Sequence, residues 1–108
     1  MYFLSYYIPT NEHQRVKQAL FNCGAGKIGS YDQCCWEIVG KGQFRPQEGS
    51  KPAYGKKNKL TILSEYKVEM VCEDHLIQDI LETLLHEHPY EQPAYFLSHT
   101  LSLNDIKK

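Results

Sequence analysis

The sequence predicts an α+β fold whose elements follow the order β-α-β-β-α-β. Three observations predict it: a strand-like run from Tyr2 to Ile8 that stops at Pro9, a long alternation of apolar and polar residues from Leu60 to Cys72, and two stretches with apolar residues at helical spacing. A doubled split βαβ unit gives a four-stranded antiparallel sheet with both helices on one face, which is the ferredoxin-like arrangement.

Length and charge limit the class of protein. A chain of 108 residues can form one core, and we expect one domain over residues 1–103 and a polar tail over 104–108. The 12 Lys and Arg nearly balance the 13 Asp and Glu, so neither nucleic acid nor an anionic membrane is expected as a partner. No apolar run is long enough to span a bilayer, and the N-terminus lacks a secretory pattern. We therefore expect a cytoplasmic protein whose cysteines are free thiols.

The first half of the chain begins with a β-α unit. After Pro9, either Thr10 or Asn11 can cap a helix. Gly24 follows the helical pattern and can take the left-handed conformation that closes a helix. The apolar face of this helix is expected to consist of Val16, Ala19, Leu20 and Cys23.

The middle of the chain is rich in Gly and Pro and joins the two halves. Its one strand-like run is Cys34 to Val39, which we expect Gly40 and Gly42 to end. Residues 43–59 are turn formers and charged residues, so we expect a long exposed loop there. Loops of this length in compact domains are usually functional or disordered.

The second half is expected to give strand, helix and strand. The alternation from Leu60 to Cys72 is typical of a long half-buried strand, one face of which is expected to carry Leu60, Ile62, Tyr66, Val68, Met70 and Cys72. Asp74 is the expected cap of the second helix, Pro89 ends that helix, and a fourth strand follows over 95–103. The apolar stripe of the helix is Ile77, Ile80, Leu81, Leu84 and Leu85.

This arrangement leaves one face of the sheet without a helical cover. We expect apolar side chains to project there, among them Phe3, Tyr7, Leu63 and Val71. An apolar face of that size favours self-association, so we expect a homo-oligomer.

One local pattern resembles a dinucleotide motif. Gly24 to Gly29 matches GxGxxG letter by letter. That motif needs a strand before it and a helix after it, so that the pyrophosphate meets a helix N-terminus. Here a helix precedes and a loop follows, so we expect a helix cap and a tight turn instead.

A second pattern consists of metal-ligating residue types. His88 and Glu91 lie near the end of the second helix, and with Cys35 they are candidate ligands for a divalent metal ion such as copper or zinc. Residues this close in one helix do not converge on one point, so a site would have to be shared between subunits. The alternative is a capping and solvent-facing role.

The basic loop is a candidate anion site. Arg45 offers a forked donor, and the glycines around it let backbone N–H groups approach a ligand. The alternative is a solvated loop whose lysines only keep the protein soluble.

Three segments carry a family resemblance. They are GAGKIGSY at 24–31, GQFRPQEG at 42–49 and HPYEQPAY at 88–95. In this order they resemble the YqfO-type domain that is inserted in the Nif-three (NGG-one-interacting-factor) proteins and is also made as a stand-alone small protein. The HPYE segment also resembles the end of CutA proteins, which share the trimeric fold of PII signalling proteins. The resemblance covers about residues 2 to 103.

The resemblance implies a PII/CutA-like fold and makes a trimer the first oligomer to test. It places the 43–59 loop where PII proteins bind their partners, which could be small molecules or proteins. It implies no hydrolase activity, because the dinuclear metal centre of the longer Nif-three proteins belongs to a surrounding domain that this sequence lacks. Gln92 and Phe96 stand where the family commonly has acidic residues, which weakens a borrowed metal site.

Three functions stay open at this point. The leading one is a non-catalytic binding or regulatory module of unknown ligand, with Arg45 and Glu48 as ligand contacts and with Tyr90 and Glu91 shaping the cleft. The second is a CutA-like protein that binds copper or zinc. The third, an enzyme with a site between subunits, has the least support. The residues expected to set backbone geometry are Gly24, Gly26, Gly29, Pro46, Gly49 and Pro89.

Overall fold

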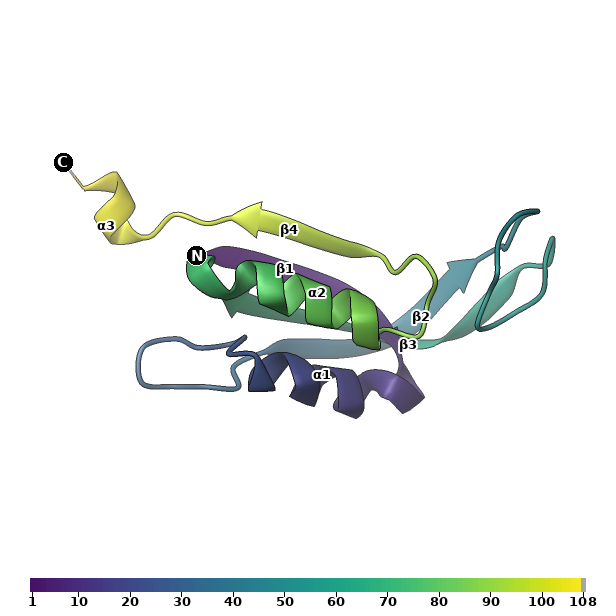
Figure 1. The fold of residues 1–108 in the computed structure, drawn as a ribbon, viewed down its shortest axis with the longest axis horizontal. Coiled ribbons are helices and arrows are strands. Elements are labelled where there is room, and N and C mark those ends of the chain that lie inside the picture. Colours follow the sequence, from purple (N-terminus) through teal and green to yellow (C-terminus); the bar gives the residue numbers. More distant parts are fainter. Residues whose placement is uncertain (108) are drawn as a thin grey trace.

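The fold is a four-stranded antiparallel sheet with two helices packed on one face (Figure 1). The structure is a computed structural model and describes residues 1–107. The strand order is β2-β3-β1-β4, which confirms the predicted α+β, ferredoxin-like class. The elements are β1 (Tyr2–Pro9), η1 (Thr10–Glu12), α1 (His13–Asn22), β2 (Trp36–Phe44), β3 (Thr61–Cys72), η2 (Asp74–Leu76), α2 (Ile77–Glu87), β4 (Tyr95–His99) and α3 (Leu103–Ile106).

The register of the sheet explains which side chains are buried. Leu4 lies opposite Met70 on one side and Leu97 on the other, so the even-numbered residues of β1 and β3 share a face. This face packs against α1 and α2 and forms the core, whereas the odd-numbered residues point the other way. The buried apolar residues are Leu4, Tyr6, Ile8, Val16, Leu20, Ala25, Val68, Met70, Cys72, Ile80 and Leu84.

The opposite face of the sheet carries apolar side chains, and no helix within residues 1–107 covers it. The strand pairing puts Phe3 and Val71 on it, as predicted, together with Tyr7 and Leu63. Three large side chains on this face are well exposed: Trp36 at 66%, Ile38 at 61% and Phe96 at 61%. We call this surface the open face.

Strand β2 is longer than the sequence indicated. It was expected to end at Gly40 and Gly42, but both glycines pair with β3, opposite Glu65 and Leu63, and the strand runs on to Phe44. The exposed loop therefore starts later than residue 43. Glycine did not end the strand because cross-strand hydrogen bonding, which glycine supports as well as any residue, outweighs its low strand propensity.

Residues 41–64 project from the body of the protein, and we call them the arm (Figure 1). Strand β1 pairs with β3 only from Glu65 onward, so in the arm β3 has β2 as its one neighbour among the described residues. Leu60 and Ile62, which belong to the predicted apolar alternation, are 59% and 58% exposed. In the described part of the chain, no helix packs against that part of the strand to cover them.

Both predicted helix caps are wrong, and the side chains concerned have other partners. Thr10 lies in η1, and its hydroxyl donates a hydrogen bond of 2.9 Å to the carbonyl of Ser64. Asp74 lies in η2 and pairs with the N-terminal amine at 2.5 Å. The end of α1 is as expected: the amides of Gly24 and Ala25 bond back to Phe21 and Leu20, the pattern of a Schellman motif.

The C-terminal end also differs in detail from the prediction. Strand β4 stops at His99, short of the expected residue 103. Residues of the expected polar tail form the short helix α3, in which Asp105 accepts a 2.7 Å hydrogen bond from the amide of Ser102. A reciprocal capping box of this kind stabilises a helix start. Within residues 1–107, no helix has the length and apolar character needed to cross a membrane.

Candidate functional site

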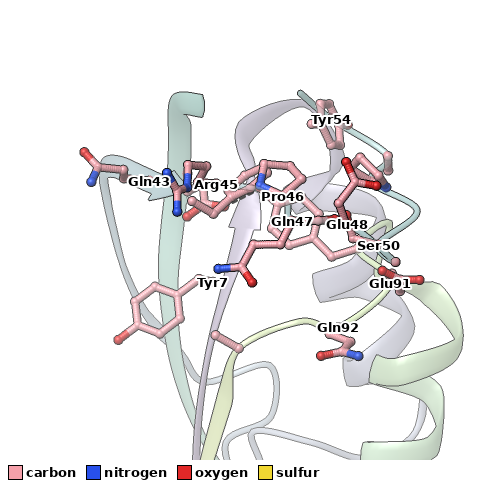
Figure 2. A pocket seen from close by; sticks show the side chains of 17 residues that line it. Tyr7, Gln43, Arg45, Pro46, Gln47, Glu48, Ser50, Tyr54, Glu91 and Gln92 are labelled. Atoms are coloured by element: carbon pink, nitrogen blue, oxygen red, sulfur yellow. Dashed lines mark hydrogen bonds between the residues drawn. The ribbon is translucent and has the colours of Figure 1, made fainter. Parts of the chain in front are cut away.

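A cavity of about 600 Å³ lies where the arm meets the rest of the sheet (Figure 2). Four parts of the chain line it: residues of the arm between Gln43 and Tyr54, Tyr7 of β1, Glu65 of β3, and residues between Tyr90 and Ala94 after α2. Small-molecule sites commonly have volumes of about 300–1,000 Å³. The cavity is thus large enough for a small organic ligand.

The four residues expected at a ligand site, Arg45, Glu48, Tyr90 and Glu91, all line this cavity. In Figure 2, Arg45 lies on one side of the cavity and Glu48 and Glu91 lie on the other. The sequence analysis placed them around a cleft between subunits, whereas here one chain brings all four together. Within residues 1–107, no carboxylate lies within 4.0 Å of the Arg45 guanidinium.

His88 holds one wall of the cavity against β1. It caps the end of α2 and is only 5% exposed. The Tyr90 amide donates a 3.1 Å hydrogen bond to Nδ1, so Nε2 carries the proton and donates at 2.6 Å to the carbonyl of Tyr7. Burial lowers the pKa of His88 below its usual value, which keeps the ring in this neutral form.

Tyr90 reaches from this wall to the floor of the cavity. Its hydroxyl donates a hydrogen bond to Oε2 of Glu65, whose side chain is 9% exposed. Burial, followed by the hydrogen bond and the charge of Glu65, raises the pKa of Tyr90, so the phenol stays a donor. Gly42 provides the space for the carboxylate, since a Cβ at that position would lie 1.8 Å from Oε1 of Glu65.

Aromatic rings surround Tyr90. The centroid of its ring lies 5.6 Å from that of Phe44 and 5.8 Å from that of Tyr54, both in edge-to-face arrangements. Such pairs add about 0.5–1.5 kcal/mol beyond the area that they bury. The rings therefore fix the arm against the segment that follows α2 and give the cavity an aromatic wall.

The loop of the arm has its own hydrogen bonds. Asn58, in the left-handed region with φ 63°, donates from its amide to the carbonyl of Pro46 at 2.5 Å and from Nδ2 to Glu48 at 3.2 Å. The amide of Lys51 donates to Glu91 at 3.1 Å and so links the loop to the segment after α2. These contacts order a loop whose length alone left its order open.

The residues expected to set backbone geometry fall into two groups. Pro46 and Gly49 line the cavity, and Pro89 follows His88, the C-cap of α2. The other three, Gly24, Gly26 and Gly29, lie between α1 and β2, and the 2.8 Å bond from the Gly26 amide to the Val71 carbonyl puts them at the far end of β3 from the cavity. Gly26 is required there, because it has φ 79° and a Cβ would lie 2.5 Å from the Cys34 carbonyl oxygen.

The candidate metal ligands do not come together in this chain. Both ring nitrogens of His88 are hydrogen-bonded, Glu91 accepts from the Lys51 amide, and the thiol of Cys35 contacts Glu37 at 3.8 Å. Among residues 1–107, no group of three His, Cys, Asp or Glu is arranged to hold a metal ion. The three were grouped by residue type, which does not place them in space.

Three lining residues were not predicted from the sequence: Glu65, Phe44 and Tyr54. Glu65 read as one polar member of an alternating strand, and nothing in its neighbours along the chain indicates a buried carboxylate. The one available signal was Gly42 in a strand, since a glycine there often marks a close approach of another group. The register pairs Gly42 with Leu63, and only the fold shows that the side chain of Glu65, two residues along β3 on the same face, reaches across to Gly42.

The chain is similar to one group of proteins in sequence and to a wider group in fold. No known family profile matches the chain. By fold the chain resembles CutA proteins. Its match to the periplasmic divalent cation tolerance protein CutA from Archaeoglobus fulgidus covers 93% of this chain and 84% of the CutA chain, with a TM-score of 0.64 and 14% identity. That degree of identity supports the CutA/PII-like fold and nothing beyond it.

By sequence the chain is similar to one segment of longer proteins, each named GTP cyclohydrolase 1 type 2 homolog. It is 35% identical over 97 residues to the GTP cyclohydrolase 1 type 2 homolog of Halalkalibacterium halodurans and 36% identical over 106 residues to that of Listeria monocytogenes. A solved structure from Bacillus cereus, a protein related to NIF3, matches 89% of the chain with a TM-score of 0.75 and 29% identity.

These matches confirm the resemblance carried by the three segments. The matched regions include 90% and 97% of this chain but only 26% and 28% of the two named homologs. The chain thus spans about a quarter of the length of the relatives that it matches.

Proposed function

We propose that this protein is a non-catalytic small-molecule-binding module of the YqfO/Nif-three type, acting in the cytoplasm, whose ligand site is the cavity at the base of the arm. The observation that carries this proposal is the convergence of Arg45, Glu48, Tyr90 and Glu91 on one cavity of about 600 Å³. A hydrophobic core has no need of these residues, and loop residues that a rigid scaffold holds together are typical of binding sites.

The proposed role is regulatory. The cavity is closed on one side by the loop of the arm, which is tied to the rest of the protein by the Lys51 to Glu91 hydrogen bond and by the ring of Tyr54. A ligand that contacts both sides would stabilise the closed arrangement of the arm. The arm would then present a different surface to a protein partner in the bound and free forms.

We further propose that the protein acts as a homotrimer through the open face. Trp36, Ile38 and Phe96 on this face are each more than 60% exposed, and apolar surface of that kind favours a partner copy. The proposed number of three subunits rests on the CutA/PII-like fold. Sedimentation equilibrium should give three times the chain mass of 12.6 kDa, and Trp36→Lys should reduce it to that of one chain.

The ligand site is tested by a screen and a pair of variants. A ligand that binds only the folded state raises the melting temperature, so a thermal-shift screen of metabolites and nucleotides should find a saturating compound. Arg45→Ala and Glu48→Ala should weaken its binding, whereas Lys57→Ala, an exposed change in the same arm, should not. Equal binding by all of these proteins would refute the assignment of the site.

Two alternatives have narrower support. The names of the relatives favour a role connected with a GTP cyclohydrolase reaction, which a direct assay with GTP would detect. Binding of a divalent metal by His88, Glu91 and Cys35 requires His88 to give up a hydrogen bond. Equilibrium dialysis against copper and zinc should give a stoichiometric signal that His88→Ala abolishes if that alternative holds.

A further inference from the structure

The floor of the cavity contains a carboxylate with unused capacity to accept hydrogen bonds. Glu65 is nine-tenths buried and receives one hydrogen bond, from Tyr90 to Oε2. From residues 1–107, Oε1 receives no hydrogen bond, and no Lys, Arg or His lies within 4.0 Å of the carboxylate. Oε1 is not among the fully enclosed polar atoms that lack a partner in the described part of the chain, so it keeps some access to solvent, and Glu65 is one of the residues that line the cavity.

The rest of the lining favours a positively charged ligand. Three carboxylates, Glu48, Glu65 and Glu91, face the cavity, against one guanidinium, that of Arg45. Tyr90 adds an aromatic ring beside Glu65, flanked by Phe44 and Tyr54. Aromatic faces attract cations as well as flat apolar groups.

We propose that the cavity binds a small planar aromatic ligand that carries a cationic N–H group, of the amidinium or ammonium type, and that this group donates to Oε1 of Glu65. A charge-assisted hydrogen bond is about twice as strong as a neutral one, and it would complete the solvation of a buried carboxylate. The flat part of the ligand would lie against the rings, and a hydrogen-bond-accepting part would contact Arg45, which lies on the side of the cavity opposite Glu48 and Glu91. This inference rests on the proposed function, because it names the ligand chemistry of the same cavity.

The experiment uses three probes of one shape and different charge. Benzamidine is a flat cation with N–H donors, benzamide is its neutral counterpart, and benzoate is an anion. Each is titrated into ¹⁵N-labelled protein, and amide shifts of Gly42, Tyr54 and Tyr90 report on the cavity. We expect saturable shifts with benzamidine, at least tenfold weaker binding of benzamide and no binding of benzoate.

Two variants and a control identify the group that is responsible. Glu65→Gln keeps the size of the side chain and an acceptor for Tyr90, and it should weaken benzamidine at least tenfold. Glu69→Gln changes a carboxylate on the same side of the same strand, paired with Lys67 outside the cavity, and should change nothing. If Glu65→Gln does not fold, the three probes on the unaltered protein decide the question, because binding of benzamide or benzoate as tight as that of benzamidine overturns the cationic ligand.

The outcomes separate this inference from the proposed function. Equal affinity for the three probes, or benzamidine binding unchanged by Glu65→Gln, overturns the cationic ligand. Absence of benzamidine shifts at the cavity overturns it as well. If other compounds of the thermal-shift screen still shift the amides of Tyr54 and Tyr90, the cavity remains a ligand site of different chemistry. If none does, both the inference and the proposed function fail.

Discussion

The hydroxyl of Tyr90 donates a hydrogen bond to the carboxylate of Glu65, which joins the segment after α2 to the middle of β3. This bond closes the cavity at its floor. Tyr90→Phe should lower the free energy of unfolding by about 1–2 kcal/mol, since a largely buried acceptor loses its donor. Urea denaturation measures the change. Tyr31→Phe, at a position that is 74% exposed, is the control and should have no effect. A loss below about 0.5 kcal/mol for Tyr90→Phe would show that cavity water replaces the phenol.

Gly42 and Glu65 form a second testable pair. Gly42→Ala should destabilise the protein by about 1–3 kcal/mol, because the new methyl group would overlap the Glu65 carboxylate. Gly40→Ala is a matched control in the same strand, with nothing within 4 Å of its Cβ. The cost of Gly42→Ala should largely disappear in a Glu65→Ala background. A cost that persists in that double variant would contradict the steric explanation.

His88 predicts the pH dependence of stability. Its pKa is lowered in the folded state, so the unfolded chain binds the proton more readily. The contribution of His88 to stability is therefore complete above the unfolded pKa of about 6.5 and is lost as the pH falls from there towards the folded pKa. Chemical denaturation at several pH values between 7.5 and 5 measures the slope of the free energy of unfolding against pH.

The slope can be assigned to His88 by substitution. His88→Asn retains a donor and an acceptor without the titration, and its stability should fall less than that of the unaltered protein over this pH range. His75→Asn, at a side chain that is 75% exposed, should leave the slope unchanged. Parallel pH profiles for His88→Asn and the unaltered protein would refute the role of His88.

The cysteines should differ in reactivity. Burial raises the pKa of Cys72 to about 11, and its side chain is 1% exposed, whereas Cys35 is exposed. The thiolate is the reactive form, so Cys72 should react with a disulfide reagent only after unfolding. Mass spectrometry of peptides after brief labelling reads out each position. Rapid native labelling of Cys72 would mean that the core beneath α1 and α2 opens readily.

Local pattern was sufficient for the fold but not for the site. Tyr66, Val68, Met70 and Cys72 were assigned correctly to the core face because a strand alternates with period two wherever a helix covers it. The same alternation wrongly predicted burial of Ile62, because β3 extends beyond the helices at that position. The spacing of apolar residues along one strand cannot show where the layer of helices that covers it ends.

The cavity shows the same limit more sharply. Arg45, Glu48, Tyr90 and Glu91 were predicted as ligand residues because loops contain specific residues that a core does not need, and all four line one cavity. Their convergence depends on the buried ring of His88 and on a loop ordered by Asn58, which no local spacing shows. Glu65 was missed because a carboxylate in an alternating strand is normally solvent-facing. Its burial follows from the pairing of β2 with β3 and from the contact with Tyr90, and both join residues that are far apart in the sequence.

The arm also makes the molecule an electric dipole. Between Lys41 and Lys59 the chain has six Lys and Arg and one Glu, while the remainder has six basic and twelve acidic residues, so an overall charge of −1 hides two oppositely charged parts. A field of this kind orients the protein before contact, and an anionic surface would meet the arm first. The Debye length is about 8 Å at physiological ionic strength, so added salt should slow such encounters while leaving the fold intact.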